Sequence, residues 1–552
     1  MRTECATATI AHAVTVAAGV YAPGHLGELT QYLPFELVDD VLAVTKTVQR
    51  RLRVLPSRAG VYFVLALGMF PHLGYLRVWG KLTAGLAGLD LPHPSGKALR
   101  DLRRRLGPAP LKALFEVVAG PLAQPHTPGV RFAGLRTVAF DGLNSLKIPD
   151  TARNRSWAGK IRHRLGLAGY PALRLMTLAE TGTRGLLGAT LGSRTDRDET
   201  ALARRLQHLL GPGMLVLLDR AFDSNTFLAE IAATGAVPLA RAKSTRIPAV
   251  LQHLPDGSYL SRLDGLDVRI VEATVTMTGT DGTRIADAYR LITTLADHRL
   301  YPAETLVRLY HQRWEIESAY LALRHTLLDG QVLRSGDRPG VEQELWALLT
   351  LYQLLRMAMV DAVETRPGTN PDRASFTTAL EAARGQLTAA AGIRPPGPAG
   401  PTVIGHAVLA TLLPARRPRF SARKVKCATS RYLNHGDDRP HTVTAITTIS
   451  VTMHTPPLRD PTSRRRPHRK TSTLIGPPRP TRRQKITAII TSQPPRDWTP
   501  RELAIMLNVH PRPLATQLRE WSLPGFFTRT GLGTYRLNTP TLPPSSPTGP
   551  DP

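Results

Sequence analysis

The 552-residue sequence is poor in cysteine and has no long apolar segment. Its two cysteines, Cys5 and Cys427, lie far apart, so they form neither a metal-binding spacing nor a disulfide framework, and they fit a reducing cytoplasm. The longest apolar run, residues 61–70, is too short to cross a bilayer. The N-terminus has no basic region followed by a long apolar core, so we expect no secretory signal. These absences favour a cytoplasmic protein without a membrane partner.

Acidic residues are also scarce. The chain has 42 Asp and Glu against 71 Lys and Arg, which gives a net charge of +29 and a pI near 10.9. Such a chain is expected to bind a polyanion, with nucleic acid first and an anionic membrane second. Residues 415–485 contain 18 Lys and Arg but only 3 acids, about half of the net charge. We expect this Pro- and Thr-rich segment to extend over nucleic acid or to stay disordered.

The first part of the chain has a helical pattern. The length of the whole chain predicts two to four domains. Helices are predicted over residues 36–53, 61–70, 95–106 and 111–118, and the third of them carries several arginines. A small helical module with a basic face is typical of a DNA-binding domain. A helical cap with a solvated charged face is an equally good interpretation of this segment alone.

The pattern changes to alternating strands and helices after residue 136. Because central strands covered on both faces are continuously apolar, this order predicts an α/β sheet with helices on both faces. Asp-Gly pairs between short runs of Val, Ile, Thr and Tyr then predict hairpins in a β-rich insertion. Strands are predicted at residues 137–140, 172–180, 185–193, 214–218 and 237–242, helices at 198–210 and 225–233, and the hairpins at 267–277 and 288–294.

Residues 310–324 combine charged and aromatic residues at helical spacing. At about 100° per residue, Tyr310, Arg313, Glu317 and Arg324 project at about 0°, 300°, 340° and 320°. A helix would therefore place a carboxylate, two guanidinium groups and a phenol on one face. This face suits a site for a metal ion and a phosphate, whereas an amphipathic helix with a charged outer face is the plain alternative. A second apolar helix is predicted over residues 341–360.

Two aspartates provide possible partners for Glu317. Asp141 and Asp219 each follow a predicted apolar strand, and α/β sheets place their sites at the ends of parallel strands. Each Asp alone is more typical of a turn. Three carboxylates from separate elements, in a chain this basic, instead favour a two-metal phosphoryl-transfer site, because Mg²⁺ prefers carboxylate oxygens.

These residues resemble a known family. The spacing of Tyr310, Arg313, Glu317 and Arg324 is similar to the Y-x2-R-x3-E-x6-K signature of bacterial DDE transposases of the insertion-sequence-four type, with Arg324 in place of the final Lys. The segments FDG at 140–142 and LDRAF at 218–222 look like the first and second Asp regions of that family. The resemblance covers about residues 26–360.

The resemblance implies a ribonuclease H-like core interrupted by a β-rich insertion. It also implies cut-and-paste transposition with Mg²⁺ or Mn²⁺: water attacks at the transposon end, and the freed 3′-hydroxyl later attacks target DNA, with a hairpin intermediate in some relatives. The implied partners are double-stranded DNA, as inverted-repeat ends and as target, and a second copy in a homodimer on DNA. The implied metal ligands are Asp141, Asp219 and Glu317, and the implied DNA-binding residues are Tyr310, Arg313 and Arg324.

Some points remain open at this stage. Relatives can stack a flipped base on an aromatic residue of the insertion, for which Tyr259 and Tyr289 are the tyrosines present in residues 244–300. Replacing Lys by Arg at position 324 keeps the charge but changes the geometry of phosphate binding. A transposase-derived DNA-binding protein without catalysis, and a metal-dependent DNA nuclease, are the alternative functions.

The C-terminal part has a pattern of its own. Thr499, Pro500 and Glu502 form a capping box with Pro at the first helical position. A second helix over residues 512–521 and a hairpin over 526–537 would complete a winged-helix-like module, with a small docking module as the alternative.

The predicted α/β fold has these parts: an N-terminal helical DNA-binding domain (1–125), the ribonuclease H-like core (126–243 and 301–364), the β-rich insertion (244–300), a Pro/Ala/Gly-rich and then basic linker (365–485), the winged-helix-like module (486–540) and a disordered tail (541–552).

Overall fold

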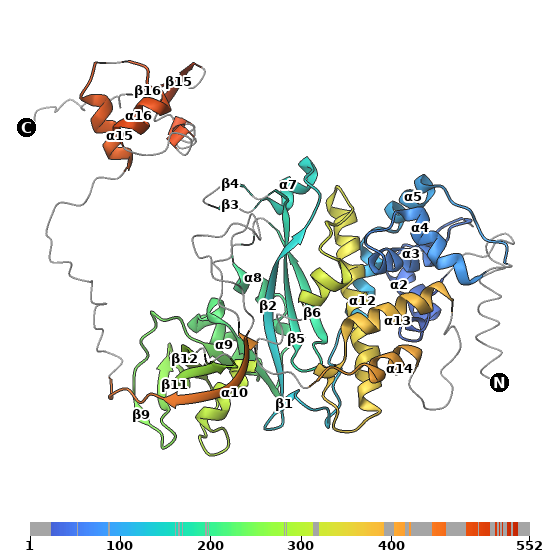
Figure 1. Ribbon diagram of the computed structural model, residues 1–552, viewed down its shortest axis with the longest axis horizontal. Helices are drawn as coiled ribbons and strands as arrows, with labels where there is room; N and C mark the ends of the chain where they lie inside the picture. The colour runs from blue at the N-terminus through green and yellow to red at the C-terminus, as the bar shows by residue number, and fades with distance from the viewer. Residues whose placement is uncertain are drawn as a thin grey trace, which may run out of the picture. The chain divides into compact units, whose positions relative to one another are not determined.

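The computed structural model divides the chain into two compact units, residues 1–463 and 464–552 (Figure 1). Each unit is described by itself. The described residues are 24–51, 53–86, 89–160, 162–163, 166–167, 169–193, 196, 198–280, 282, 284–312, 320–390, 402–414, 419–420, 444–459, 482–494, 496–507, 514–515, 518, 521–522, 527–531 and 534–538.

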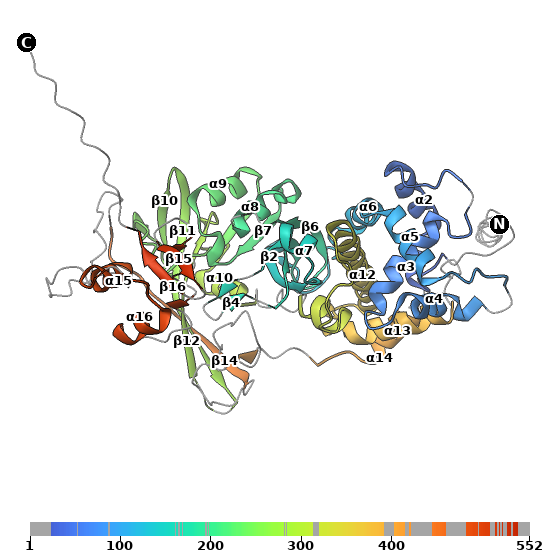
Figure 2. The ribbon, with the colours of Figure 1, turned by 90° about the horizontal axis from the view of Figure 1, so that it is seen from above.

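The first unit begins with a helical layer whose core is shared with helices from later in the chain. In both views the long helix α12 (Arg338–Glu364) lies between the N-terminal helices and the sheet (Figures 1 and 2). Although α12 is long and apolar enough to cross a membrane, 89% of its most apolar stretch is buried inside the protein. The other helices of this layer are α2 (Phe35–Val44), α3 (Ser57–Met69), α4 (Tyr75–Thr83), α5 (Gly96–Leu106), α6 (Ala109–Val118), α13 (Phe376–Thr388) and α14 (Val403–Ala410), with 3-10 turns η1 (Leu29–Gln31), η2 (Ala84–Leu86) and η6 (Pro371–Arg373).

Local signals explain the bounds of helix α5. Ser95 caps α5 by accepting a hydrogen bond from the Ala98 amide, and Gly107, with φ of 67°, ends it. The predicted helices α3, α5 and α6 are confirmed, whereas α2 ends at Val44, nine residues before the predicted end, and α4 was not predicted.

The prediction of a linker over residues 365–485 is wrong where the chain forms α13, α14 and the strand β14 (Thr444–Met453). The buried residues of α13 follow helical spacing, but two of the five positions are occupied by the small residues Ala379 and Ala383, so the apolar stripe is weak in sequence. Packing against the apolar surface of α12 stabilises this helix. Most of the basic segment, including residues 421–443 and 460–481, lies outside the described residues.

The centre of the unit is a large mixed sheet. Its strand order is β13-β14-β11-β12-β8-β7-β2-β5-β6. Strand β2 runs parallel to β7, and β7 parallel to β8, while β5 is antiparallel to β2 and β6 to β5. The predicted α/β sheet is confirmed, and this order is consistent with a ribonuclease H-like fold. These five strands are β2 (Leu135–Lys147), β5 (Ala172–Glu180), β6 (Leu186–Gly192), β7 (Met214–Leu218) and β8 (Val237–Arg241).

Helices cover both faces of the central strands. Val138 and Phe140 of β2 pack with α8 (Glu199–Arg204) and α9 (Asn225–Ala233), whereas Ala139 packs with α10 (Ala303–Gln312). Because side chains alternate along a strand, odd-numbered positions here face α10. Short elements connect these parts: α7 (Ala152–Ala158), η3 (Gln207–Leu209), η4 (Arg220–Phe222), η5 (Ala322–Leu327), β1 (Arg131–Phe132), β3 (Arg162–His163) and β4 (Gly166–Leu167).

The β-rich insertion extends the central sheet. Its hairpin of β11 (Leu266–Gly279) and β12 (Arg284–Thr293) is confirmed, and β12 pairs antiparallel with β8 of the core. Strand β14 then joins β11 from the other side, with Val451 opposite Val275. The remaining strands of this region are β9 (Gln252–His253), β10 (Tyr259–Leu263) and β13 (Arg419–Phe420).

The second unit contains helices and a hairpin around a small core that includes Trp498. The predicted capping box of Thr499 and Glu502 is present at the start of its second helix. The predicted hairpin is confirmed, but most of the helix predicted over 512–521, like the tail at 541–552, lies outside the described residues, so the winged helix stays a prediction. Its described elements are α15 (Arg482–Thr491), α16 (Pro500–Met506), β15 (Phe527–Gly531) and β16 (Thr534–Leu537).

Candidate active site

The pairing of β2 with β7 brings the two predicted aspartates together. Ala139 lies opposite Leu217 in this parallel pair, and Asp141 and Asp219 each follow two residues further along. The two aspartates therefore occupy matching positions at the carboxyl end of β7. By alternation, Asp141 lies on the same face of β2 as Ala139, the face that α10 covers.

The sequence predicts that Asp141 follows a strand, but this residue lies within strand β2. Strand β2 continues to Lys147, because it stays paired with β5, where Thr177 is opposite Asp141. Gly142 and Asn144 have low strand propensity, so the sequence does not indicate a strand here. Pairing with β5 stabilises the strand despite this low propensity. Asp219 does follow its strand, and its Oδ1 accepts a hydrogen bond from the Ala221 amide at 2.7 Å.

The two carboxylates have the chemistry that a divalent ion needs. Oxygen ligands of this kind suit Mg²⁺ and Mn²⁺, and in the described part of the chain no Arg or Lys forms an ion pair with Asp219. Asp141 Oδ1 accepts a hydrogen bond from the Gly142 amide at 3.0 Å. No group of three potential metal ligands occurs among the described residues, and the predicted third ligand, Glu317, lies outside them. Asp141 and Asp219 would thus provide two of the ligands.

The Tyr310 side chain is turned into the protein. It is 3% exposed, and its hydroxyl donates to the Leu218 carbonyl at 2.9 Å, directly before Asp219. Its ring also packs edge-to-face on Tyr289, with 5.8 Å between centroids. This arrangement differs from the predicted phosphate contact, for which the hydroxyl would have to leave Leu218. Arg313, the next residue of the signature, lies outside the described residues.

Arg324 is half-buried in a π-helical turn, η5. The Leu328 amide donates to the Leu323 carbonyl at 3.1 Å, an i→i+5 bond. The prediction of an uninterrupted α-helix up to Arg324 is therefore wrong, and the angle of about 320° predicted for this residue does not apply, since it assumes about 100° per residue throughout. Arg324 Nε donates to His325 Nε2 at 3.0 Å. Its contact with DNA stays a prediction.

Sequence reasoning did not single out Tyr320. Its side chain is 7% exposed, and its hydroxyl donates to the Asp141 carbonyl and lies 2.7 Å from Thr177 Oγ1. Burial, followed by the charge of Asp141, raises the pKa of Tyr320 well above its ordinary value, so the phenol stays neutral. The available signal was its position three residues after Glu317, on the same face of the predicted helix.

Glu199 at the start of α8 was also overlooked. Its Oε1 accepts a hydrogen bond from Asn144 Nδ2 at 2.8 Å, and a Cβ added to Gly142 would lie 2.7 Å from the same oxygen. A side chain at position 142 would thus collide with this carboxylate. Because Gly142 and Asn144 alternate with Asp141, Glu199 lies on the opposite face of β2. The same alternation explains why we do not count it as a ligand with Asp141.

Neither tyrosine of the insertion offers a ring to a flipped base. Tyr259 is 1% exposed and Tyr289 is 4% exposed. Tyr259 donates its hydroxyl to Glu272 at 2.6 Å, and the Tyr289 hydroxyl lies 2.9 Å from His311 Nδ1. Both side chains belong to the core of the insertion and its contact with α10.

The basic face of the N-terminal helical domain is smaller than the sequence indicates. In α5, Arg100 and Arg104 are exposed. Arg103 is instead buried in an ion pair with Glu344 of α12, 3.0 Å apart, and Arg105 donates to the Leu55 carbonyl. Only part of the arginine cluster is therefore available to a polyanion.

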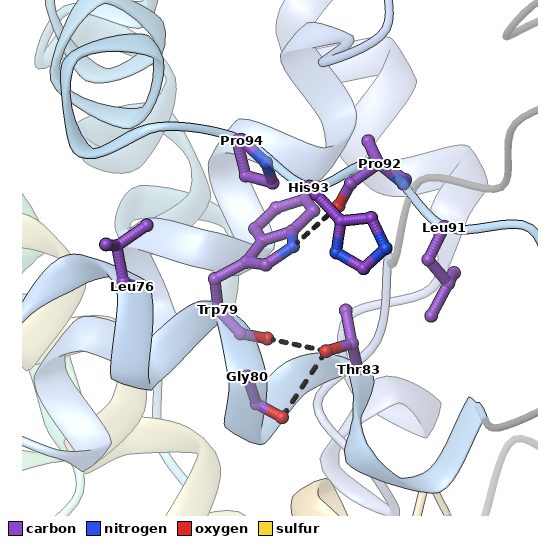
Figure 3. A pocket seen from close by; sticks show the side chains of 8 residues that line it. All are labelled: Leu76, Trp79, Gly80, Thr83, Leu91, Pro92, His93 and Pro94. Carbon is purple, nitrogen blue, oxygen red and sulfur yellow. Dashed lines mark hydrogen bonds between the residues drawn. The ribbon is translucent and has the colours of Figure 1, made fainter.

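A pocket of about 270 Å³ lies in the same helical domain, between α4 and residues 91–94 (Figure 3). Trp79 lines it and donates its indole N–H to the Pro92 carbonyl at 3.1 Å. The pocket lining contains no carboxylate, so it lacks the side-chain oxygen ligands that Mg²⁺ prefers.

Comparison with known proteins gives two family matches and a relative. Residues 137–354 match the family described as "Transposase DDE domain", and residues 23–116 match "Insertion element 4 transposase N-terminal". The transposase InsG for insertion sequence element IS4 of Escherichia coli (strain K12) is 27% identical over 419 residues, covering 73% of this chain and 92% of the relative. The cryo-EM structure of a piggyBac transposase synaptic complex with hairpin DNA covers 73% of this chain and 87% of that chain, with 10% identity and a TM-score of 0.34, a likeness too weak to carry an argument.

The mixed sheet with aspartates at matching positions of adjacent strands, lying inside the DDE-domain match, defines a metal-dependent DNA transposase. The two family matches together span more than half of the chain. The chain belongs to the IS4 family of DDE transposases. This confirms the family that residues 140–142, 218–222 and 310–324 indicate in the sequence.

Proposed function

We propose that this transposase moves an insertion sequence by a cut-and-paste route. It would hydrolyse the DNA at the ends of the element and then use the freed 3′-hydroxyl to attack target DNA. The observation that supports this route best is the parallel pairing of β2 with β7, which sets Asp141 beside Asp219 at the carboxyl end of β7. Glu317 would complete the set of carboxylates.

The proposed roles follow from the chemistry of the side chains. Asp141, Asp219 and Glu317 would hold two divalent ions through carboxylate oxygens. When bound, Mg²⁺ or Mn²⁺ would activate the attacking oxygen and stabilise the leaving oxygen. Arg313 and Arg324 would bind phosphates next to the cleaved bond and orient the strand, with Arg324 offering a planar fork where relatives have Lys.

The proposed partners are duplex DNA and a second copy of the chain. The exposed Arg100 and Arg104 of α5, the basic segment and the winged-helix-like module would neutralise DNA phosphates, so affinity should fall steeply with salt. Bringing two ends together favours a homodimer on DNA. We expect this work to take place in the cytoplasm, where the DNA of a bacterial relative resides.

The test uses the full chain with Mg²⁺ or Mn²⁺ and a duplex carrying the inverted repeats that flank its gene. Cleavage at the repeat end, joining of that end to target DNA, and loss of both in Glu317→Ala and Asp219→Asn are expected. Asp198→Asn is a matched control, because Asp198 also caps a helical turn, with Oδ1 accepting the Ala201 amide at 2.7 Å. Binding without cleavage would instead indicate a lapsed DNA-binding protein, and cleavage without joining a nuclease.

A further inference from the structure

Two buried tyrosine hydroxyls donate to backbone carbonyls at or directly before the two aspartates. Tyr310 donates to the carbonyl of Leu218, the residue before Asp219. Tyr320 donates to the carbonyl of Asp141 itself. Both rings are buried, at 3% and 7% exposed. The main chain at each aspartate is therefore fixed by a tyrosine hydroxyl, and the two tyrosines are ten residues apart in the sequence.

The Tyr320 hydroxyl also forms a hydrogen bond with Thr177 of the neighbouring strand β5. A carbonyl oxygen only accepts, so the Tyr320 hydroxyl must donate its proton to Asp141. The Thr177 hydroxyl, 2.7 Å away, then donates to the Tyr320 oxygen. Thr177 is 1% exposed and lies directly opposite Asp141 in the β2–β5 register. The main chain of Asp141 is thus tied to β5 and to the Tyr320 side chain at one point.

In the sequence, the two tyrosines flank the third predicted ligand. Glu317 comes seven residues after Tyr310 and three residues before Tyr320. We infer that Tyr320, together with Tyr310, is a positioning residue: each holds the main chain at one of two proposed metal ligands, Asp141 and Asp219. Each phenol would act through a backbone carbonyl, not as a ligand of the ion. This inference rests on the proposed function of the three carboxylates.

A purely structural role for these tyrosines predicts a different result. Loss of a buried hydroxyl would then lower stability without changing metal affinity. Tyr62 provides the matched control: it is fully buried in the N-terminal helical core, and its hydroxyl donates to the Leu33 carbonyl at 2.8 Å. Tyr62→Phe therefore removes the same kind of hydrogen bond away from the strand ends.

The experiment measures Mn²⁺ binding to the full chain by electron paramagnetic resonance, alongside thermal unfolding. We expect Tyr320→Phe and Tyr310→Phe to weaken Mn²⁺ binding by roughly 10–100-fold, the usual effect of losing a partner that orients a ligand. Tyr62→Phe should leave the Mn²⁺ affinity unchanged, while all three variants lower the unfolding midpoint by similar amounts. Equal affinities in Tyr320→Phe and Tyr62→Phe would overturn the inference.

Thr177 supplies a second, independent variant. Thr177→Ser keeps the hydroxyl and should retain the wild-type Mn²⁺ affinity, whereas Thr177→Val should lose part of it. Because both residues act through one hydrogen-bonded unit, Thr177→Val should add little to Tyr320→Phe. Full additivity of the two losses would contradict the proposed arrangement.

Cleavage of end DNA separates this inference from the proposed function. If the wild-type chain binds Mn²⁺ but does not cleave, the proposed function fails, while the ratio of Mn²⁺ affinities still decides the role of Tyr320. If it cleaves, Tyr320→Phe should lower kcat and leave the KM for DNA unchanged. A wild-type chain that binds no Mn²⁺ would overturn the inference as well.

Discussion

Asp141 of β2 and Asp219 at the end of β7 occupy matching positions of two hydrogen-bonded parallel strands, two residues beyond the pair Ala139 and Leu217. Their separation is thus fixed by backbone pairing in the centre of the sheet and does not depend on a flexible loop. Sites built on such elements are held more accurately than sites on loops. The proposed metal site therefore lies on the central strands of the sheet.

Asp219→Asn should abolish activity and preserve the fold. The Asn side-chain oxygen can still accept from the Ala221 amide, so the cap remains, but the negative charge is lost. Cleavage of end DNA should fall by at least about 100-fold, since even partners of metal ligands are worth about 10–100-fold. A gel assay checks the rate, and thermal unfolding with an unchanged midpoint checks the fold.

Glu180 should be a major contributor to stability. It is fully buried, forms an ion pair with Arg136, and accepts the amides of Leu122 and Ala123 at 3.1 and 3.0 Å. Glu180→Ala leaves these groups unpaired, so the free energy of unfolding should fall by about 3–5 kcal/mol. Urea titration measures this change.

The control for Glu180 is an exposed ion pair. Glu304 pairs with Arg308 on α10, with side chains 54% and 47% exposed. Glu304→Ala should cost only about 0.3–0.5 kcal/mol. A similar loss of unfolding free energy in the two variants would contradict the role assigned to the burial of Glu180.

Gly182 should tolerate no side chain in the β5–β6 turn. Its φ is 76°, and an added Cβ would lie 2.8 Å from the Gly129 carbonyl oxygen. Gly213 has a similar φ of 80° with open space around it. Gly213→Ala should thus cost about 1 kcal/mol from backbone strain alone, and Gly182→Ala about 1–3 kcal/mol more. Equal costs, measured by urea unfolding, would contradict this account.

His25 should make stability depend on pH. Its Nε2 donates to the Leu82 carbonyl at 3.0 Å, and its Nδ1 accepts the Gly27 amide at 3.2 Å, so the ring is held neutral. Burial, only partly offset by the bond to Leu82, lowers the pKa of His25 below its ordinary value of 6.5. The unfolded chain then takes up a proton first as the pH falls.

The stability contributed by neutral His25 is therefore present above pH 6.5 and is lost as the pH falls through the lower folded pKa. Urea unfolding at pH 7.5 and 5.0 should show a smaller decline in His25→Gln than in the wild type. Replacing the exposed His406 by Gln should leave the decline unchanged. An equal decline in all three proteins would rule out His25 as its source.

The parts predicted correctly from the sequence rest on local signals. The bounds of β5, β7 and α9 agree with the prediction because their apolar runs are bordered by turn residues. Asp219 was identifiable for the same reason, since it ends a continuous apolar strand. Asp141 was identified too, although its strand continues past it.

The parts that the sequence did not reveal depend on contacts between distant residues. Strand β14 pairs with β11 across more than 150 residues of chain, and no local pattern indicates such a pairing. In the sequence, Tyr320 resembles an ordinary core aromatic residue. The structure shows that its hydroxyl donates a hydrogen bond to the Asp141 carbonyl. The π-helical turn at Arg324 likewise leaves no signal in the spacing of residues.

The most direct test of the central claim is strand transfer from a duplex whose end already carries a free 3′-hydroxyl. With Mn²⁺ and a target plasmid, the wild-type chain should join the end to the plasmid. Asp219→Asn should reduce joining by at least about 100-fold, while Asp198→Asn stays within about twofold of the wild type. No joining by the wild type, or wild-type joining by Asp219→Asn, would contradict the account.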